Sequence, residues 1–186
     1  MSKLMWKAGT MEYPLPAVLV SCGDKNIQNV LTIAWTGIIC TDPAMTYVSI
    51  RKERYSYDII KRTGEFVINL TTEDLARVTD MAGVKTGRGI NKFEMLGITP
   101  EKAPNLNCPM VKESPVSIEC KIEEIKELGS HDMFIAKIVS VNVDEKYLDE
   151  TGKFDLEKCK LIAYSHGNYY ALGNNLGKFG FSVKKK

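Results

Sequence analysis

Two apolar segments followed at once by a cluster of cations constrain the fold of this chain most. Residues 29–43 read NVLTIAWTGIICTDP, and residues 46–58 continue as TYVSIRKERYSYD. β-Branched and aromatic residues begin each segment, which is typical of strands. The second segment then carries RKER just before Ser56, a residue that can begin a helix. The chain therefore has to place strands, a positively charged turn and a helix start side by side.

Short strands are predicted along most of the chain. Val18–Cys22, Val30–Trp35 and Tyr47–Ile50 are separated by turn residues, and we expect them to form an antiparallel meander. Apolar and polar residues alternate over 116–123, which is the pattern of a half-buried strand. Further strands are predicted at Glu65–Leu70, Phe134–Val143, Leu161–Tyr164 and Tyr169–Leu172.

Two helices are predicted, each between a hydroxyl cap and a glycine: Tyr57–Thr63 between Ser56 and Gly64, and Glu73–Ala82 between Thr72 and Gly83. Lys85–Met110 is predicted to be irregular, and a loop of that length inside a compact domain is usually functional. Many short strands with few helices predict a mainly β fold of the α+β type. We expect a small antiparallel β-barrel with short helices plugging its ends.

The composition excludes several classes of protein. The chain has 186 residues, of which 44% are apolar and 26% charged, and this predicts a single globular domain over residues 1–186. A net charge of +2 is too small for a surface that binds nucleic acid. No apolar run reaches the ~20 residues of a membrane helix, and no secretory signal is present, so we expect no membrane contact and a cytoplasmic location. Lys184–Lys186 is predicted to be a solvated tail.

Cysteine and histidine are too scattered for a metal site. The five cysteines contain no Cys-x-x-Cys pair, and histidine occurs only at His131 and His166. Neither a disulfide framework nor a zinc or iron–sulfur site fits this spacing. We therefore expect no metal, and mostly buried or half-buried free thiols.

The RKER run predicts a phosphate site. Arg51 and Arg54 follow a strand and precede the helix start at Ser56, where free backbone N–H groups and the helix dipole favour an anion. Arginine adds a fork of donors that fits phosphate oxygens. The alternative is a solvated charge run on a loop.

A second basic element occurs at Gly83–Phe93, which reads GVKTGRGINKF. It is neither a Walker loop nor a Rossmann fingerprint, because the GK[ST] ending and the strand–Gly-x-Gly-x-x-Gly–helix order are both absent. Lys92 is the best candidate to close over a bound phosphate. A flexible surface loop is the alternative interpretation.

Several other side chains suit a flat aromatic ligand. Trp35 ends a predicted strand and is followed by Thr36, and its indole is either core or a wall for a ring. The amide of Asn29 forms hydrogen bonds either within a turn or with a carbonyl or nitrogen of a ligand ring. His131 at a hairpin end is either solvated or a donor to a phosphate or a ring. Together with the cations, these residues predict a flavin mononucleotide (FMN) site.

The same residues resemble a known family. The chain is similar to the flavin reductase-like FMN-binding split-barrel proteins, and within them to the flavoredoxins. The resemblance spans about Pro14 to Val183. It is carried by NVLTIAWTGIICTDP, SIRKERYSYDII, GEFVINL, GVKTGRGINKF, SPVSIECKIEEIKELGSHDMF and LIAYSHGNYYALG.

The resemblance implies a six-stranded antiparallel split barrel, a homodimer, and FMN bound near the dimer interface. By position in the matching motifs, the residues implied to contact FMN are Asn29, Trp35, Ser56, Lys92, His131 and Tyr164, with Thr36, Cys40, Thr41, Arg51 and Arg54 as additional candidates. Threonine is common in the family where Ser56 stands, and the hydroxyl is retained. No catalytic acid or base is implied, because the flavin itself carries the redox chemistry.

Three functions remain open from sequence. The first is an FMN flavoprotein that takes electrons from NAD(P)H or from a redox protein and passes them to an acceptor, either as a reductase or as a carrier. The second is a non-catalytic module that only holds FMN. The third, which the motifs fit poorly, is a relative of pyridoxamine-phosphate oxidase.

Overall fold

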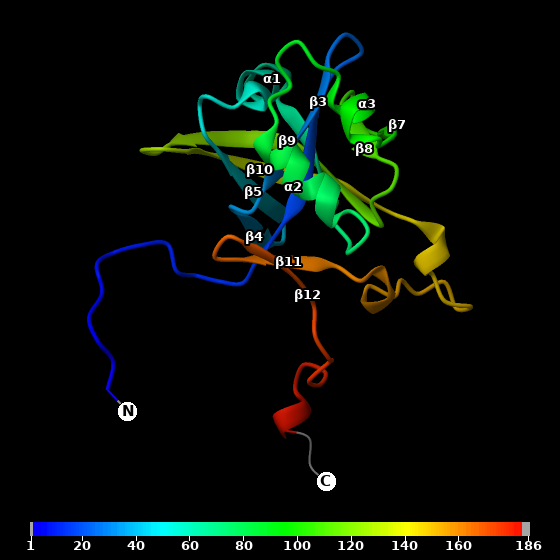
Figure 1. Cartoon of the computed structure of the whole chain (residues 1–186). Coiled ribbons are helices and arrows are strands. Elements are labelled where there is room, and N and C mark those ends of the chain that lie inside the picture. The colour runs from blue at the N-terminus through cyan, green and yellow to red at the C-terminus, as the bar shows by residue number, and fades with distance from the viewer. Residues whose placement is uncertain (1, 184–186) are drawn as a thin grey trace.

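The computed structural model describes residues 2–183, so the predicted tail Lys184–Lys186 lies outside the described residues. Its largest sheet is antiparallel, with the strand order β3-β2-β6-β9-β10-β5-β4 (Figure 1). The bounds of these strands are β2 (Val18–Gly23), β3 (Gln28–Ile33), β4 (Thr36–Thr41), β5 (Ala44–Ile50), β6 (Glu65–Leu70), β9 (Val116–Glu127) and β10 (Asp132–Val143).

This sheet is curved but open. Its two edges are β3 and β4, which follow one another in the chain and do not pair with each other. Only Ala34 and Trp35 connect these edges in sequence. The carbonyl of Trp35 accepts the backbone N–H of Ser49 in β5 at 2.9 Å, which ties the connection to the β4 side of the gap. The predicted mainly β class with short flanking helices is confirmed, and the sheet is an open one of seven strands rather than six.

Smaller elements surround the main sheet. The helices are α1 (Tyr55–Thr63), α2 (Ala76–Val84) and α3 (Lys92–Leu96), with single 3₁₀ turns at Glu145–Tyr147, Glu157–Cys159 and Phe181–Val183. β1 (Leu15–Pro16), β11 (Ile162–Ser165) and β12 (Asn168–Ala171) form a second sheet, and β7 (Pro100–Lys102) pairs with β8 (Pro109–Val111). No helix within residues 2–183 is long and apolar enough to cross a membrane.

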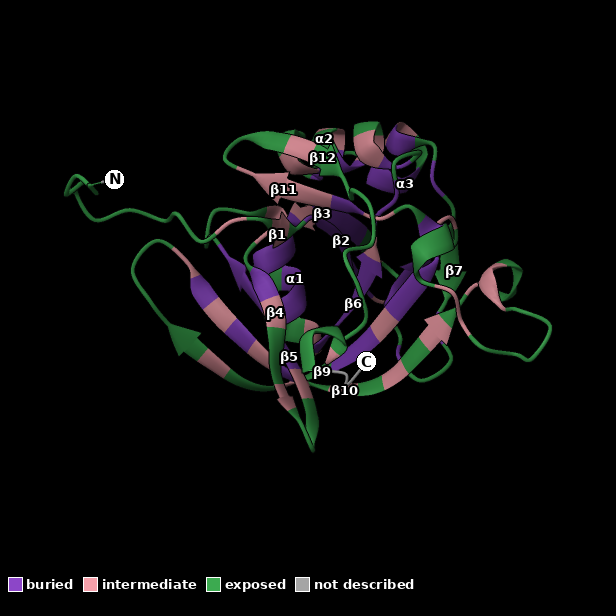
Figure 2. Cartoon of the chain, turned by 90° about the horizontal axis from the view of Figure 1, so that it is seen from below, coloured by how far each residue is buried: buried purple, intermediate pink, exposed green. Residues whose placement is uncertain are grey.

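Helix α1 lies inside the curve of the main sheet (Figure 2). Its buried face, which includes Tyr57 and Ile60, packs against inward side chains of β2, β5, β6 and β10. Phe66 and Phe134 are 0% exposed in this cluster. Burial of apolar surface contributes roughly 25 cal/mol per Å², so this cluster is the main source of stability. It also fixes where the first turn of α1 points.

Helices α2 and α3 cover the outer face of β2 and β3. Leu75, the N-cap of α2, and Ala82 of α2 pack with Phe93 and Leu96 of α3. This layer covers Leu19 and Val30 of the sheet. Strand β2 is therefore buried on both faces along its whole length. Two-sided burial explains why its sequence is nearly all apolar, as parallel strands in covered sheets usually are.

The strand predictions were wrong at two points. The predicted meander does not form, because β3 pairs only with β2 while β5 pairs with β4 and β10. The missed strand β4 follows β3 after two residues, and no glycine or proline separates the two apolar runs. The alternation over 116–123 holds, but Ser117 and Glu119 on the polar side are buried under residues 103–111 rather than solvated.

The helix predictions also need correction. Helix α1 begins after Arg54 rather than Ser56, and the Ser56 hydroxyl accepts a bond from Asn29 instead of capping the helix. Gly64 does end α1 in the left-handed conformation, with φ of 71°. Helix α2 starts at Ala76 and runs through Gly83 to Val84. The segment Lys85–Met110, predicted to be irregular, contains α3, β7 and part of β8.

The inner core supplies a direct test of this architecture. Replacing Phe66 with alanine would leave a cavity between β6 and α1, and such changes typically cost about 3–5 kcal/mol. We expect the midpoint of urea unfolding to fall accordingly. The matched change Leu128→Ala, at a side chain that is 47% exposed, should leave the midpoint nearly unchanged. Equal effects from both variants would contradict the assignment of the core.

Candidate functional site

Two adjoining cavities open beside the gap between β3 and β4. We call them the aromatic cavity, of about 300 Å³, and the basic cavity, of about 360 Å³. Arg51, Arg54 and Val84 line both cavities, so the two form one continuous depression. The walls come from β3, the end of β5, the start of α1, the last turn of α2 and β11–β12.

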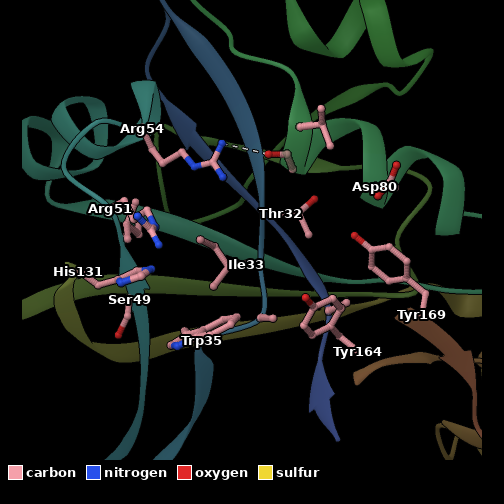
Figure 3. Close-up of a pocket in the computed structure, with 15 residues that line it drawn as sticks. Thr32, Ile33, Trp35, Ser49, Arg51, Arg54, Asp80, His131, Tyr164 and Tyr169 are labelled. Carbon is pink, nitrogen blue, oxygen red and sulfur yellow. Dashed lines mark hydrogen bonds between the residues drawn. The ribbon is translucent and has the colours of Figure 1, made fainter. Parts of the chain in front are cut away.

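The aromatic cavity has rings on opposite sides and an aliphatic floor (Figure 3). Trp35 and His131 lie nearly parallel, with an interplanar angle of 6° and ring centroids 6.1 Å apart. Tyr164 and Tyr169 face them from β11 and β12, with their own centroids 5.7 Å apart. Ile33 lies between the two sides. This arrangement suits a flat aromatic molecule, because aromatic side chains prefer offset stacks and edge contacts at such distances.

The surroundings of His131 favour the neutral form of its imidazole. Burial lowers the pKa of its imidazole, and the nearby positive charge of Arg51 lowers it further. Its Nδ1 lies 2.8 Å from the Ser130 hydroxyl, a contact that orients the ring toward the cavity. A neutral imidazole offers one N–H donor and one acceptor, so His131 can form a hydrogen bond with the edge of a ring without adding charge.

Lys92 is the most unusual cation of the basic cavity. Its side chain is 1% exposed, and its ammonium donates to the carbonyl oxygen of Ala82 at 2.6 Å. Burial lowers the pKa of Lys92 to about 8, with a further contribution from the charge of Arg54. A buried ammonium beside a second cation is unfavourable without an anion, since burial penalises the charged form. This cavity is therefore built for a negatively charged group.

Two arginines complete the positive charge of the depression. Arg54 occupies the N-cap position of α1, and its guanidinium donates to the carbonyl oxygen of Gly83 at 3.0 Å. Arg51 projects toward the same space three residues earlier. The start of α1 adds the positive end of its helix dipole.

Asn29 presents a polar atom that no other described residue satisfies. Its Nδ2 donates to the Ser56 hydroxyl oxygen at 2.7 Å, whereas its Oδ1 is buried without a hydrogen-bond partner among the described residues. The backbone of Gly87 lies against this amide, since a Cβ there would fall 2.2 Å from Oδ1. Both residues line the basic cavity. Buried polar groups are rarely left unpaired, which indicates a ligand group at this point.

The residues present fit FMN on these observations. The aromatic cavity matches a flat tricyclic ring, and the basic cavity matches a phosphate on a polyol chain. The unpartnered Oδ1 of Asn29 lies in the wall of the basic cavity, where it can accept a hydrogen bond from a ligand hydroxyl. No cluster of metal-ligating side chains is found within residues 2–183.

Most of the predicted site residues meet in this depression. Trp35, Arg51, Arg54, His131 and Tyr164 line the aromatic cavity; Asn29, Arg51, Arg54, Ser56 and Lys92 line the basic one. Three predicted residues do not line either cavity. Thr36 is buried and its hydroxyl donates to the Tyr47 carbonyl at 2.6 Å, while Cys40 and Thr41 lie at the β4–β5 turn.

The sequence prediction missed several lining residues. Thr32, Asp80, Gly83 and Tyr169 border the aromatic cavity, and Tyr55, Thr86 and Gly87 border the basic cavity. Gly87 lies in the glycine-rich segment already singled out, so its role was accessible from the sequence. Asp80 and Gly83 are on α2, whose placement against β3 no local pattern indicates.

The cavities and the open sheet define a split-barrel protein of the flavin-binding type, and comparison with known families agrees. The family model of the flavin reductase like domain matches residues 10–173. The chain therefore belongs to the flavin reductase-like family.

Individual relatives support this assignment. The structure of flavoredoxin from Desulfovibrio vulgaris (Miyazaki F) is 34% identical, with a TM-score of 0.90 over 98% of this chain and 100% of that one. Flavoredoxin from Methanosarcina acetivorans is 24% identical, with a TM-score of 0.89 over 99% and 100% of the two chains. An uncharacterized protein of Pyrococcus abyssi is 31% identical over 78% of this chain and 83% of its own length.

The lowered pKa of Lys92 predicts a pH effect on stability. The folded protein releases the Lys92 proton near pH 8, whereas an unfolded lysine keeps it to about 10.5. Between these values the unfolded state binds more protons, so Lys92 makes stability rise with pH. In phosphate-free buffer, the wild-type free energy of unfolding should therefore increase relative to Lys92→Met from about pH 8 to pH 10. Parallel profiles for the two proteins would contradict a buried, strained ammonium.

Proposed function

We propose that this protein binds FMN in the two cavities and passes electrons through it. The observation that carries the proposal is their continuity: an aromatic cavity and a basic cavity share Arg51, Arg54 and Val84. A ligand with a flat ring at one end and a phosphate at the other would occupy both cavities. The flavin reductase-like fold supports a flavin-binding redox role, and the charge of the basic cavity favours the phosphorylated flavin.

When bound, the isoalloxazine ring of FMN would supply the redox chemistry, by accepting and releasing hydride or electrons. The protein supplies binding and orientation. Lys92 and Arg54 would bind the phosphate, and the start of α1 would add the positive end of its dipole. Asn29, whose Nδ2 already donates to Ser56, would accept a hydrogen bond from a ligand hydroxyl through its free Oδ1.

The aromatic cavity controls access to the ring. Trp35 and Tyr164 border it on opposite sides and limit contact with water and oxygen (Figure 3). In its neutral form, His131 acts as a hydrogen-bond partner of the ring edge rather than as a permanent charge. Arg51 lies at the junction of the cavities, where its charge stabilises negative charge on either part of the ligand.

Reduced nicotinamide or a redox protein is the proposed electron source. Hydride transfer from NAD(P)H needs the ring to be reachable, and the aromatic cavity, which Asp80 and Tyr169 help to line, opens to the surface (Figure 3). Reduction of the bound flavin under anaerobic conditions by NADH or NADPH would identify a reductase. If no donor reduces the bound flavin, the protein is instead a module that only holds FMN.

The phosphate cations provide the test of FMN binding. Alanine at Arg54 or at Lys92 removes charge-assisted contacts worth typically ~1.5–3 kcal/mol each, which corresponds to roughly a tenfold to hundredfold loss of FMN affinity. The matched control is Arg77→Ala, which removes an exposed cation of α2 outside both cavities. The FMN affinity of all three variants is measured by titration, with flavin fluorescence as the signal. Unchanged affinity in the Arg54 and Lys92 variants would count against the basic cavity as the phosphate site.

We further propose that the protein works as a homodimer. Exposed apolar side chains collect on β4, where Ile38 is 68% exposed, and along the second half of β10, where Val141 is 54% exposed. Strand β5 pairs with β4 on one side and with Asp132–Lys137 of β10 on the other, so the part of β10 that carries Val141 runs on past the β4–β5 turn. A second copy would cover such a surface, because monomeric proteins rarely leave large apolar patches in water.

Sedimentation velocity tests the dimer. We expect the wild-type protein to sediment as a dimer and Ile38→Glu to shift it toward monomer, because a charge would be buried in the interface. Leu156→Glu, at a side chain that is 48% exposed elsewhere on the surface, serves as the control. A wild-type monomer with FMN bound would disprove this part of the proposal.

A further inference from the structure

Three helices meet at one point beside the basic cavity. The carbonyl oxygens of Ala82 and Gly83, in the last turn of α2, accept hydrogen bonds from the Lys92 ammonium at 2.6 Å and the Arg54 guanidinium at 3.0 Å. Lys92 is the first residue of α3, and Arg54 is the N-cap of α1. Helix α2 has no basic residue of its own in that last turn. Its C-terminal carbonyls are therefore capped by cations from two other elements.

These bonds leave both cations able to bind an anion. An ammonium has three N–H donors and a guanidinium has five, and each cation uses one of them on α2. The last carbonyls of a helix lack intrahelical partners and carry the negative end of the dipole, so they attract positive groups. The turn thus fixes the position of each charge and leaves the remaining N–H donors of both cations available to an anion.

The last turn of α2 is itself held firmly against β3. The Thr32 hydroxyl of β3 donates to the Thr79 carbonyl one turn earlier in the helix. A Cβ at Gly83 would lie 3.3 Å from the Cβ of Thr32, closer than side chains usually approach. Ala82 is buried at 1% exposure in the outer core. A side chain at position 83 would therefore require the helix and the strand to move slightly apart.

We infer that the last turn of α2 is the positioning element of the phosphate site, and that Gly83 is a positioning residue for Arg54 and Lys92. This inference rests on the proposed function and deepens it. Gly83 acts through the close approach of α2 to Thr32, which places the two carbonyl oxygens where they hold both cations toward the basic cavity. A larger residue at position 83 would move the turn outward and carry the cations with it.

Comparison of FMN with riboflavin tests this role, since riboflavin carries the same ring and polyol without the phosphate. In Gly83→Ala we expect weaker binding of FMN, and in Gly83→Val a loss of about tenfold or more, because charge-assisted contacts depend steeply on geometry. Riboflavin affinity should fall much less in both, because riboflavin has no phosphate contact to lose. If the valine variant does not fold, the alanine variant still gives the comparison.

A double-variant cycle shows whether the effect runs through the cation. Once Arg54 is alanine, Gly83→Ala should cost less FMN affinity than it costs in the wild-type protein, because one of the two positioned charges is gone. Gly173→Ala is the matched control: no atom would lie within 4 Å of its new Cβ, and Gly173 lines neither cavity.

The outcomes separate this inference from the proposed function. A wild-type protein that binds FMN, with Gly83 variants that weaken FMN and riboflavin equally or weaken neither, overturns the positioning role alone. Effects of Gly83→Ala and Arg54→Ala that simply add overturn it as well. Failure of the wild-type protein to bind FMN removes the proposed function, and the inference with it. Selective loss of FMN affinity with a non-additive cycle supports the inference.

Discussion

The packing of α1 inside an unclosed sheet is the constraint on which the rest of this molecule depends. A curved sheet whose edges do not pair leaves its interior and its gap to be filled by something else. Here the apolar face of α1 fills the interior through Tyr57, Ile59 and Ile60. Because the helix is fixed by that packing, its N-terminal turn is also fixed, and Arg54 and Ser56 are held beside the gap between β3 and β4. The core and the site are thus consequences of one arrangement.

Electrostatics then determines what the gap can hold. Lys92 is buried next to Arg54, and burial holds the pKa of its ammonium well below the ordinary value. The carbonyl of Ala82 offsets only part of that unfavourable charge, and an anion would offset more. The unpartnered oxygen of Asn29 adds a second unsatisfied group at the same place. Such features cost stability in the protein alone, and they are typical of sites that a ligand completes.

Much of this could be predicted from the sequence where local chemistry determines the structure. Strands such as β6 and β10 contain several β-branched residues, and Gly64 ends α1 as its conformational freedom suggests. Strand β4 was missed because Ala34 and Trp35 carry no turn signal between two apolar runs. Helix α3 was missed because it has only five residues and depends on burial of Phe93 and Leu96.

The site shows the same division. The cations, Trp35, His131 and Tyr164 could be predicted, because their side-chain chemistry is legible in sequence and the family resemblance places them. The contribution of α2 could not be predicted, because it consists of the backbone carbonyls of Ala82 and Gly83, and every residue has a backbone carbonyl. Their importance arises only from the tertiary contact between α2 and β3. Cys40 and Thr41, at the end of β4, do not line either cavity, and their predicted contact with FMN stays a prediction.

The most direct test of the account is the visible absorption spectrum of the purified protein after FMN has been added and the excess removed by gel filtration. The two joined cavities predict a flavin band that stays with the protein in about one equivalent per chain. A colourless protein after the same treatment would contradict the central claim that these cavities form a flavin site.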